Sequence, residues 1–287
     1  VVFPSFNFHD AVKERAHQHR TPAHWNESSE ELREWLDSDK FQLAVSGDGV
    51  PLVLHLPNAI HGRGREKLYQ SVEWFGRNVP LKMGKGADRK KRNKEESYHV
   101  VEGQLAGNVK LVSAWHAIGH KEPVISADVI SSARQFSLST QLIADLELLN
   151  LRLNALLEIV DPPQFLAMQE FAVALRKKYP HVKAWSAIDG LLWEGRSFQF
   201  NRQTPLHPDS TDPPKCWVAL VALGHFKGGH LFIPRLNLRL WYEPGTIILL
   251  RGHILPHVVE AFFNGQRISI AHFTHESLWD ALGLQLP

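Results

Sequence analysis

Short apolar segments separated by turn residues dominate the last third of the chain. A continuous apolar run covers 216–223, and shorter segments follow at 230–234, 238–243, 246–251, 258–263 and 267–273. Pro244-Gly245 and Asn264-Gly265 are turn signals, and the Asn-Gly pair predicts a hairpin between the last two segments. Many short strands with glycine and proline turns predict a β-sandwich or a double-sheet jelly roll.

A helical pattern precedes these strands. Apolar residues recur every three to four positions from 140 to 160, which predicts one amphipathic helix ended by Asp161-Pro162-Pro163. A second helix is predicted from about Gln164 to Tyr179, and both should pack on the outside of the jelly roll. Residues 184–201 then return to strand character.

The first hundred residues have weaker periodicity. Ser28 and Glu31 fit the Ser-x-x-Glu capping pattern and predict a short helix that continues through Leu36. Strands are predicted at 41–45 and 50–56, and a helix at 66–75. Together the patterns predict one mixed α+β domain over residues 1–287, with an N-terminal mixed region at 1–135, supporting helices at 136–180 and a jelly-roll core at 184–277.

Basic residues gather in one segment, although the formal net charge is only +2. Between positions 82 and 94 a single acid, Asp88, stands among the bases Lys82, Lys85, Arg89, Lys90, Lys91, Arg92 and Lys94. Such a loop can follow the phosphates of a nucleic acid. A solvated insertion or a nuclear-import signal explains the same run, and the sequence does not decide between these interpretations.

The cysteine content and the hydropathy of the chain indicate the cellular compartment. The chain has one cysteine, Cys216, which excludes an intrachain disulfide and fits a reducing compartment. No apolar run approaches the roughly 20 residues that span a bilayer, and no signal peptide opens the chain. We therefore expect an intracellular protein with no membrane segment. We also expect it to be nuclear and monomeric.

His207-Pro208-Asp209, His257 and Arg267 carry the candidate chemistry. Side chains two positions apart on an extended segment point to the same side, so His207 and Asp209 can bind one metal. Two imidazoles and a carboxylate on one face of Fe(II) leave three coordination positions for a keto acid and O₂. The predicted hairpin would bring Arg267 near the metal, where its guanidinium suits a distal carboxylate. His253 competes with His257 as the second imidazole.

The stretch 201–275 resembles the TET/JBP family of iron- and 2-oxoglutarate-dependent nucleic-acid dioxygenases, and most closely the compact fungal and protist members. The resemblance rests on the segments 201–209, 226–234, 243–252, 265–267 and 273–275, together with His257. It implies a double-stranded β-helix core with Fe(II) and 2-oxoglutarate as cofactors. It also implies stepwise oxidation of 5-methylcytosine in double-stranded DNA, through hydroxymethyl to formyl and carboxyl forms.

The same resemblance implies roles for individual residues. His207, Asp209 and His257 match the iron ligands, and the ten-residue gap between His257 and Arg267 favours His257 over His253. Arg267 matches the arginine that holds the distal carboxylate of 2-oxoglutarate. Arg202 matches an arginine near the cosubstrate and the flipped base. Asp212 takes the place of a polar residue that accepts from the exocyclic amine of the base. Phe273 matches an aromatic residue that stacks on the base, and His275 matches a histidine that hydrogen-bonds to it.

Simpler roles and other substrates stay open at this point. Asp212 precedes two prolines and can be a turn residue, Phe273 can be strand core, and His275 can be a surface residue. The cysteine-rich extension of animal members is absent, so the 82–94 segment, Arg63 and Arg65 are the candidates for gripping DNA. Because a carboxylate accepts equally from N6 of adenine, N6-methyladenine demethylation is an alternative activity, and hydroxylation of a protein or small molecule is another.

Overall fold

The computed structural model describes residues 1–17, 31–37, 39–83, 95–116 and 122–287. The strands are β1 (Val2–Phe3), β2 (Arg33–Trp35), β3 (Gln42–Ser46), β4 (Pro51–Leu56), β5 (Gly107–Val112), β6 (Gly195–Phe200), β7 (Val218–Gly224), β8 (Lys227–Gly228), β9 (Leu231–Ile233), β10 (Leu238–Leu240), β11 (Ile247–Leu250), β12 (Val258–Val259), β13 (Phe262–Phe263) and β14 (Arg267–Phe273). The helices are α1 (Phe8–His17), α2 (Gly62–Asn78), α3 (Ala127–Ile130), α4 (Ala133–Asp145), α5 (Glu147–Val160), α6 (Pro162–Lys178), α7 (Pro180–Ser186) and α8 (Glu276–Leu282).

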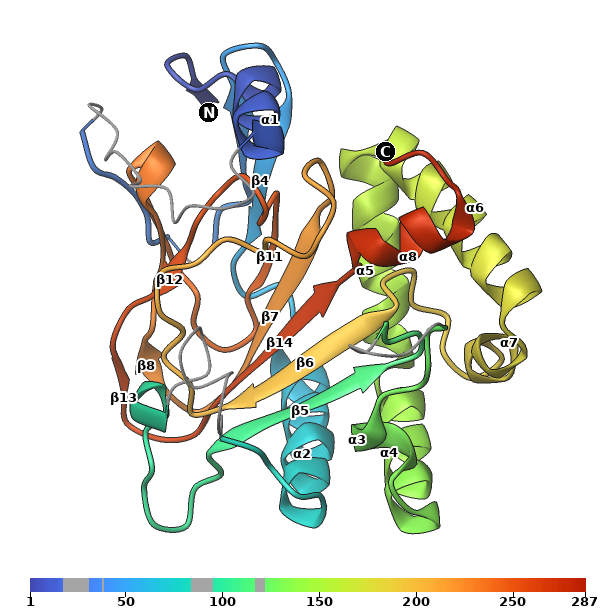
Figure 1. Ribbon diagram of the computed structural model, residues 1–287. Helices are drawn as coiled ribbons and strands as arrows, with labels where there is room; N and C mark the ends of the chain where they lie inside the picture. The colour runs from blue at the N-terminus through green and yellow to red at the C-terminus, as the bar shows by residue number, and fades with distance from the viewer. Residues whose placement is uncertain (18–30, 38, 84–94, 117–121) are drawn as a thin grey trace.

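A large sheet, a facing small sheet and a layer of helices make up the protein (Figure 1). The large sheet has eight strands in the order β1-β3-β4-β11-β7-β14-β6-β5, and the small sheet has the order β12-β9-β10-β2. β8 and β13 form a separate pair. The mixed α+β fold with a jelly-roll core, predicted from the sequence, is confirmed.

Side chains along each strand of the large sheet point alternately to its two faces, so the strands contribute to two hydrophobic cores. On β7, Ala219, Val221 and Leu223 pack in the cluster that contains the helices. Val218 and Leu220 point to the other face, into the cluster shared with the small sheet. As predicted, the central helices cover the outside of the jelly roll, and Figure 1 shows α5, α6 and α8 grouped there. No helix in the described ranges is long and apolar enough to cross a membrane.

Two helix predictions need correction. The helix predicted over 140–160 is two helices, α4 and α5, which meet at Leu146. Ser132 caps α4, since its side chain accepts from the backbone N of Gln135 at 3.1 Å. The helix predicted after Ser28 is wrong over its described part, because 33–35 form β2 and pair in parallel with β10. Pairing with the small sheet and burial of Trp35 outweigh the local capping signal.

The predicted hairpin at Asn264-Gly265 is also wrong. Both residues have positive φ angles, so a turn does form there. The strand before it, β13, pairs with β8, whereas the strand after it, β14, runs between β6 and β7 in the large sheet. The chain therefore changes sheets at this turn, and the position of Arg267 is set by β6 and β7 instead.

Two buried histidines should make the fold sensitive to acid. Burial lowers the pKa of His55 to about 4 and that of His272 to about 3. An unfolded histidine titrates near about 6.5. Their stabilising effect is therefore complete above that pH and is lost as the pH falls below it, at about 1.4 kcal/mol per pH unit for each histidine.

Urea unfolding between about pH 7.5 and about pH 5 measures this loss. We expect His55→Gln, which keeps a side chain able to hydrogen-bond to Trp241 O, to reduce the fall in unfolding free energy by about 2 kcal/mol, the share of one such histidine over this pH range. A pH dependence identical in the variant and the native protein would contradict the prediction.

Candidate active site

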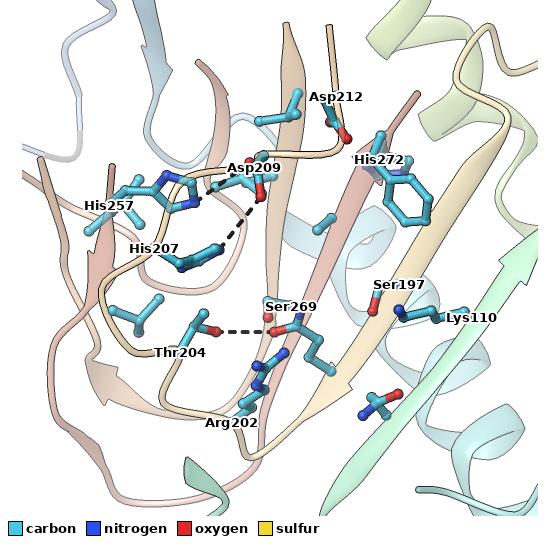
Figure 2. Close-up of a pocket in the computed structure, with 18 of the residues that line it drawn as sticks. Lys110, Ser197, Arg202, Thr204, His207, Asp209, Asp212, His257, Ser269 and His272 are labelled. Atoms are coloured by element: carbon cyan, nitrogen blue, oxygen red, sulfur yellow. Dashed lines mark hydrogen bonds and ion pairs between the residues drawn. The ribbon is translucent and has the colours of Figure 1, made fainter. Parts of the chain in front are cut away.

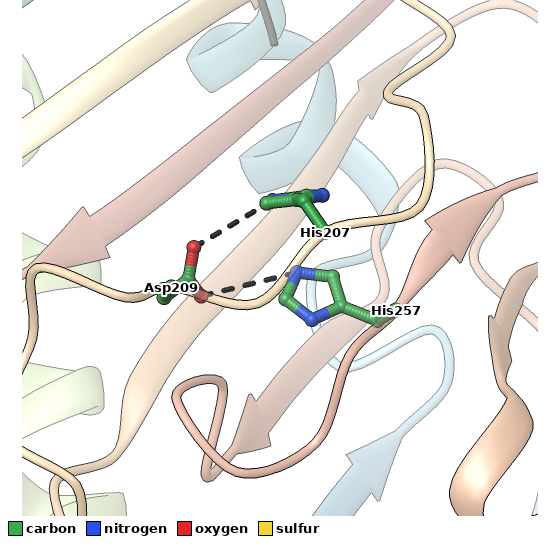
Figure 3. Close-up of side chains that lie close together, drawn as sticks. All are labelled: His207, Asp209 and His257. Carbon is green, nitrogen blue, oxygen red and sulfur yellow. Dashed lines mark ion pairs between the residues drawn. The ribbon is translucent and has the colours of Figure 1, made fainter. Parts of the chain in front are cut away.

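His207, Asp209 and His257 converge at one point between the two sheets (Figure 3). Asp209 Oδ1 lies 3.6 Å from His207 Nε2, and Asp209 Oδ2 lies 3.8 Å from His257 Nε2. One donor atom from each residue lies within 4.8 Å of the other two. A metal ion about 2.1 Å from each donor fits such a spacing. Within the described ranges this is the one group of three such residues.

Backbone carbonyls orient both imidazoles. His207 Nδ1 lies 2.8 Å from Pro205 O, and His257 Nδ1 lies 3.0 Å from Leu255 O. Because a carbonyl oxygen only accepts, each Nδ1 carries the proton and each Nε2 offers its lone pair to the cluster. The two imidazoles are therefore held in the tautomer that a metal ion needs.

Backbone pairing between two loops brings the cluster together. His207 and His257 exchange two backbone hydrogen bonds of 3.1 and 2.9 Å, and Asp209 N donates to Gly252 O at 2.9 Å. The loop after β6 and the loop after β11 thus hold each other in place. His253 lies on the same loop, but its Nδ1 is 2.5 Å from Asp212 O, so it anchors Asp212 and is not part of the cluster.

Gly252 leaves the space that the Asp209 carboxylate occupies. A Cβ at Gly252 would lie 2.2 Å from Asp209 Oδ2 and 3.0 Å from Val218 Cγ2. We predict that Gly252→Ala displaces the carboxylate and weakens metal binding about 10- to 100-fold, the usual effect of disturbing the support of a metal ligand. Titration with Mn(II) measures this loss. Gly64→Ala is the control, since a Cβ there meets nothing within 4 Å. Equal affinities in the two variants would contradict the prediction.

Arg267 is fully buried at the back of the site. Its Nη1 donates to Arg202 O at 3.0 Å and to Ser269 Oγ at 3.3 Å. Three rings surround the guanidinium, with the centroids of Phe226, Tyr242 and Phe262 at 5.4, 5.2 and 5.5 Å. Burial lowers the pKa of Arg267, but a guanidinium stays charged in proteins.

Two nitrogens of Arg267, Nε and Nη2, lack a hydrogen-bond partner among the described residues. Burying a cation whose N–H groups have no acceptor destabilises the protein unless an anion binds there. The distal carboxylate of a keto acid such as 2-oxoglutarate would satisfy both the charge and the donors. The residues present therefore fit Fe(II) and 2-oxoglutarate.

One cavity of about 350 Å³ joins the metal cluster to the predicted base contacts (Figure 2). Its floor consists of side chains from β5, β6 and β14, and its lining includes Arg202, Asp212, Phe273 and His275. Arg202 is also buried, with its guanidinium 5.7 Å from the centroid of the Tyr98 ring. The structure thus brings the metal cluster, Arg202 and the three predicted base contacts to one cavity. Arg267 does not line this cavity and lies behind it, where it contacts the lining residues Arg202 and Ser269.

Two of the predicted base contacts, Phe273 and His275, lie at and just after the end of β14, and the third, Asp212, lies in the loop before β7. Asp212 forms a turn through its backbone N, which donates to Asp209 O at 3.0 Å, while its buried carboxylate lines the cavity. The half-buried ring of Phe273 lies on Gly195, where a Cβ would be 2.4 Å from Phe273 Cε2. His275 receives support from Glu194, whose Oε1 accepts from His275 N at 2.7 Å and lies 3.3 Å from His275 Nδ1.

The structure describes only some of the residues that were predicted to contact the DNA backbone. Lys82 forms an ion pair with Asp128. Lys85, Arg89, Lys90, Lys91 and Arg92 lie outside the described residues. Arg65, at the start of α2, donates from Nη1 to Pro244 O at 3.4 Å.

Sequence reasoning missed several residues of the cavity. Lys110 and Ser197 line it, and Glu194 supports His275 from beneath. The sequence did not point to Lys110, because β5 lies far along the chain from the metal motif. Alternation on β5 gives a partial signal, since Val109 and Leu111 are buried under the helices while Lys110 faces the other way.

No protein-family model and no curated protein matches the chain. Among solved structures, NgTET1 in complex with 5mC DNA is similar, with a TM-score of 0.58 and 18% identity over 94% of this chain and 89% of that chain. An oxidoreductase of the 2OG-Fe(II) oxygenase family from Burkholderia pseudomallei has a TM-score of 0.40 and 11% identity, over 78% of this chain and 88% of that chain.

The similarity to NgTET1 shows the fold of this chain. The chain has a TET-like jelly-roll fold, because the NgTET1 structure aligns over nearly all of both chains.

Proposed function

We propose that the protein is an Fe(II)- and 2-oxoglutarate-dependent DNA dioxygenase that oxidises 5-methylcytosine to its 5-hydroxymethyl, 5-formyl and 5-carboxyl forms. One observation carries the proposal. A single cavity contains the His207, Asp209 and His257 cluster together with an acidic acceptor, an aromatic ring and an imidazole. A methylated base could therefore lie with its methyl group toward the metal.

His207, Asp209 and His257 would hold the iron, and Arg267 would hold the distal carboxylate of 2-oxoglutarate. When bound, the two groups supply an oxidant for C–H bonds, with CO₂ and succinate as the other products. The buried setting of Arg267, with Phe226, Tyr242 and Phe262 around it, keeps water away from that carboxylate.

The methyl group of 5-methylcytosine is inaccessible to this cavity while the base is stacked, so the nucleotide must be flipped out of the duplex. Flipping costs a few kcal/mol of stacking and pairing. Stacking on Phe273 offsets part of this cost. Asp212 accepts from the exocyclic N4 amine, as carboxylates do with cytosine, and His275 contacts the base edge.

N6-methyladenine is a second candidate substrate, since the Asp212 carboxylate can accept from N6 as well as from N4. The supporting observation is the same buried carboxylate in the cavity. It would require the methylated amine itself to face the metal. We propose double-stranded DNA with a methylated base as the partner of a monomeric, nuclear enzyme.

One experiment tests the proposal and separates the candidates. The protein is incubated with Fe(II), 2-oxoglutarate and duplexes that contain either 5-methylcytosine or N6-methyladenine, and the nucleosides are analysed by mass spectrometry. Oxidised cytosines are expected with the native protein and are expected to be absent with His207→Ala. If neither base changes while succinate forms with a protein or small-molecule substrate, the DNA proposal is wrong.

A further inference from the structure

The cavity floor extends past the base contacts to the edge strand β5. Strand register places Lys110 beside Ser197, Ser197 beside Ala271, and Ala271 beside Leu220. These four residues form one row across β5, β6, β14 and β7, and all of them line the cavity. Lys110 is therefore the cation at the outer end of the floor.

The metal cluster lies at the opposite end of this row. A Cβ on Gly252 would touch both Asp209 and Val218, so Asp209 lies above β7. Three strand spacings of about 4.8 Å, or roughly 14 Å, separate β7 from β5. Figure 2 shows Lys110 and the three metal-cluster residues on opposite sides of the cavity. This span exceeds the width of one pyrimidine ring, so Lys110 lies beyond a base whose methyl group reaches the metal.

The surroundings of Lys110 suit a nucleic-acid backbone. Its Nζ lies 5.1 Å from the centroid of the Trp115 ring, and the centroids of the Trp115 and His275 rings are 5.1 Å apart in a T-shaped arrangement. The backbone N of Lys110 donates to Asp128 Oδ2 at 2.9 Å, which fixes this part of the edge strand. A cation beside aromatic rings is the combination with which grooves bind single nucleic-acid strands.

We propose that Lys110 binds the phosphate next to the flipped nucleotide, so that the cavity selects a nucleotide within a strand over a free nucleoside. The inference rests on the proposed function, since it takes the cavity to be the base pocket. It assigns the phosphate contact to β5, inside the cavity, and is independent of the basic segment at 82–94.

The test compares binding of two probes under conditions without turnover. The probes are a single-stranded trinucleotide with central 5-methylcytosine and the nucleoside 5-methyl-2′-deoxycytidine, each titrated in the presence of Mn(II) and 2-oxoglutarate. Lys110→Met keeps the length of the side chain without its charge, and Lys110→Arg keeps the charge. Lys177→Met, on the exposed surface of α6, is the control.

We expect Lys110→Met to weaken trinucleotide binding about tenfold or more, as the loss of a charge-assisted hydrogen bond does. The slope of log K against log salt should become shallower by about 0.7, the value for one phosphate contact on a single strand. Nucleoside binding should not change, Lys110→Arg should restore trinucleotide binding, and Lys177→Met should behave like the native protein.

Two results would overturn the inference. One is a Lys110→Met variant with native trinucleotide affinity and salt slope. The other is equal weakening for nucleoside and trinucleotide, which would make Lys110 a base contact. Failure of the proposed function has a different signature, because the native protein would then bind neither probe while it still forms succinate from 2-oxoglutarate.

Discussion

Asp209→Asn is expected to abolish metal binding and 2-oxoglutarate turnover together. The substitution keeps the shape of the side chain but removes the negative charge that lies 3.6 and 3.8 Å from the two imidazole Nε2 atoms. An amide oxygen is a weaker ligand for a divalent metal, and metal catalysis contributes several kcal/mol to lowering the barrier. We expect succinate formation to fall by about three orders of magnitude or more. Mn(II) titration and succinate analysis measure the two losses.

The melting temperature separates this loss of function from a loss of fold. Asp209 lies in a loop and its side chain is partly exposed, so Asp209→Asn should melt close to the native protein in the absence of metal. Asp280→Asn is a matched control, because Asp280 is an exposed acid on α8. Native metal affinity in Asp209→Asn would exclude the cluster as the metal site.

The sequence predicted the parts of the site that depend on local geometry. Period-two alternation placed His207 and Asp209 on one side of an extended segment, and the two side chains do point to one place. The apolar runs also predicted β7, β9, β10, β11 and β14 within a few residues of their observed bounds.

Features that depend on long-range pairing were not predictable from the sequence. The Asn264-Gly265 signal was interpreted as a hairpin, but the flanking strands find partners in different sheets. The periodicity over 140–160 continues through the joint at Leu146, so the pattern could not reveal the break between α4 and α5. Lys110 reaches the cavity only because β5 pairs with β6, and no local motif records that pairing.

Arg267→Lys is expected to raise the 2-oxoglutarate concentration needed for half-maximal turnover by about 10- to 100-fold. The ammonium keeps the charge but loses the planar pair of donors that a carboxylate binds at two points. A charge-assisted hydrogen bond is worth about 1.5–3 kcal/mol, and each 1.4 kcal/mol corresponds to about a tenfold change in affinity. Affinity for methylated DNA should change little, because Arg267 lies at the back of the site, fully buried.

A second buried arginine, Arg196, provides the control for Arg267→Lys. It distinguishes the loss of a cosubstrate contact from the general effect of replacing a buried guanidinium. Arg196 is equally buried, but it pairs with Asp189 at 2.7 Å, on the helix side of the large sheet. Arg196→Lys should therefore lower the melting temperature without changing the 2-oxoglutarate requirement. Nε and Nη2 of Arg267 have no hydrogen-bond partner among the described residues. Replacing Arg267 should therefore affect the 2-oxoglutarate requirement more than the melting temperature. If both variants had the native 2-oxoglutarate requirement, the guanidinium of Arg267 would have a purely structural role.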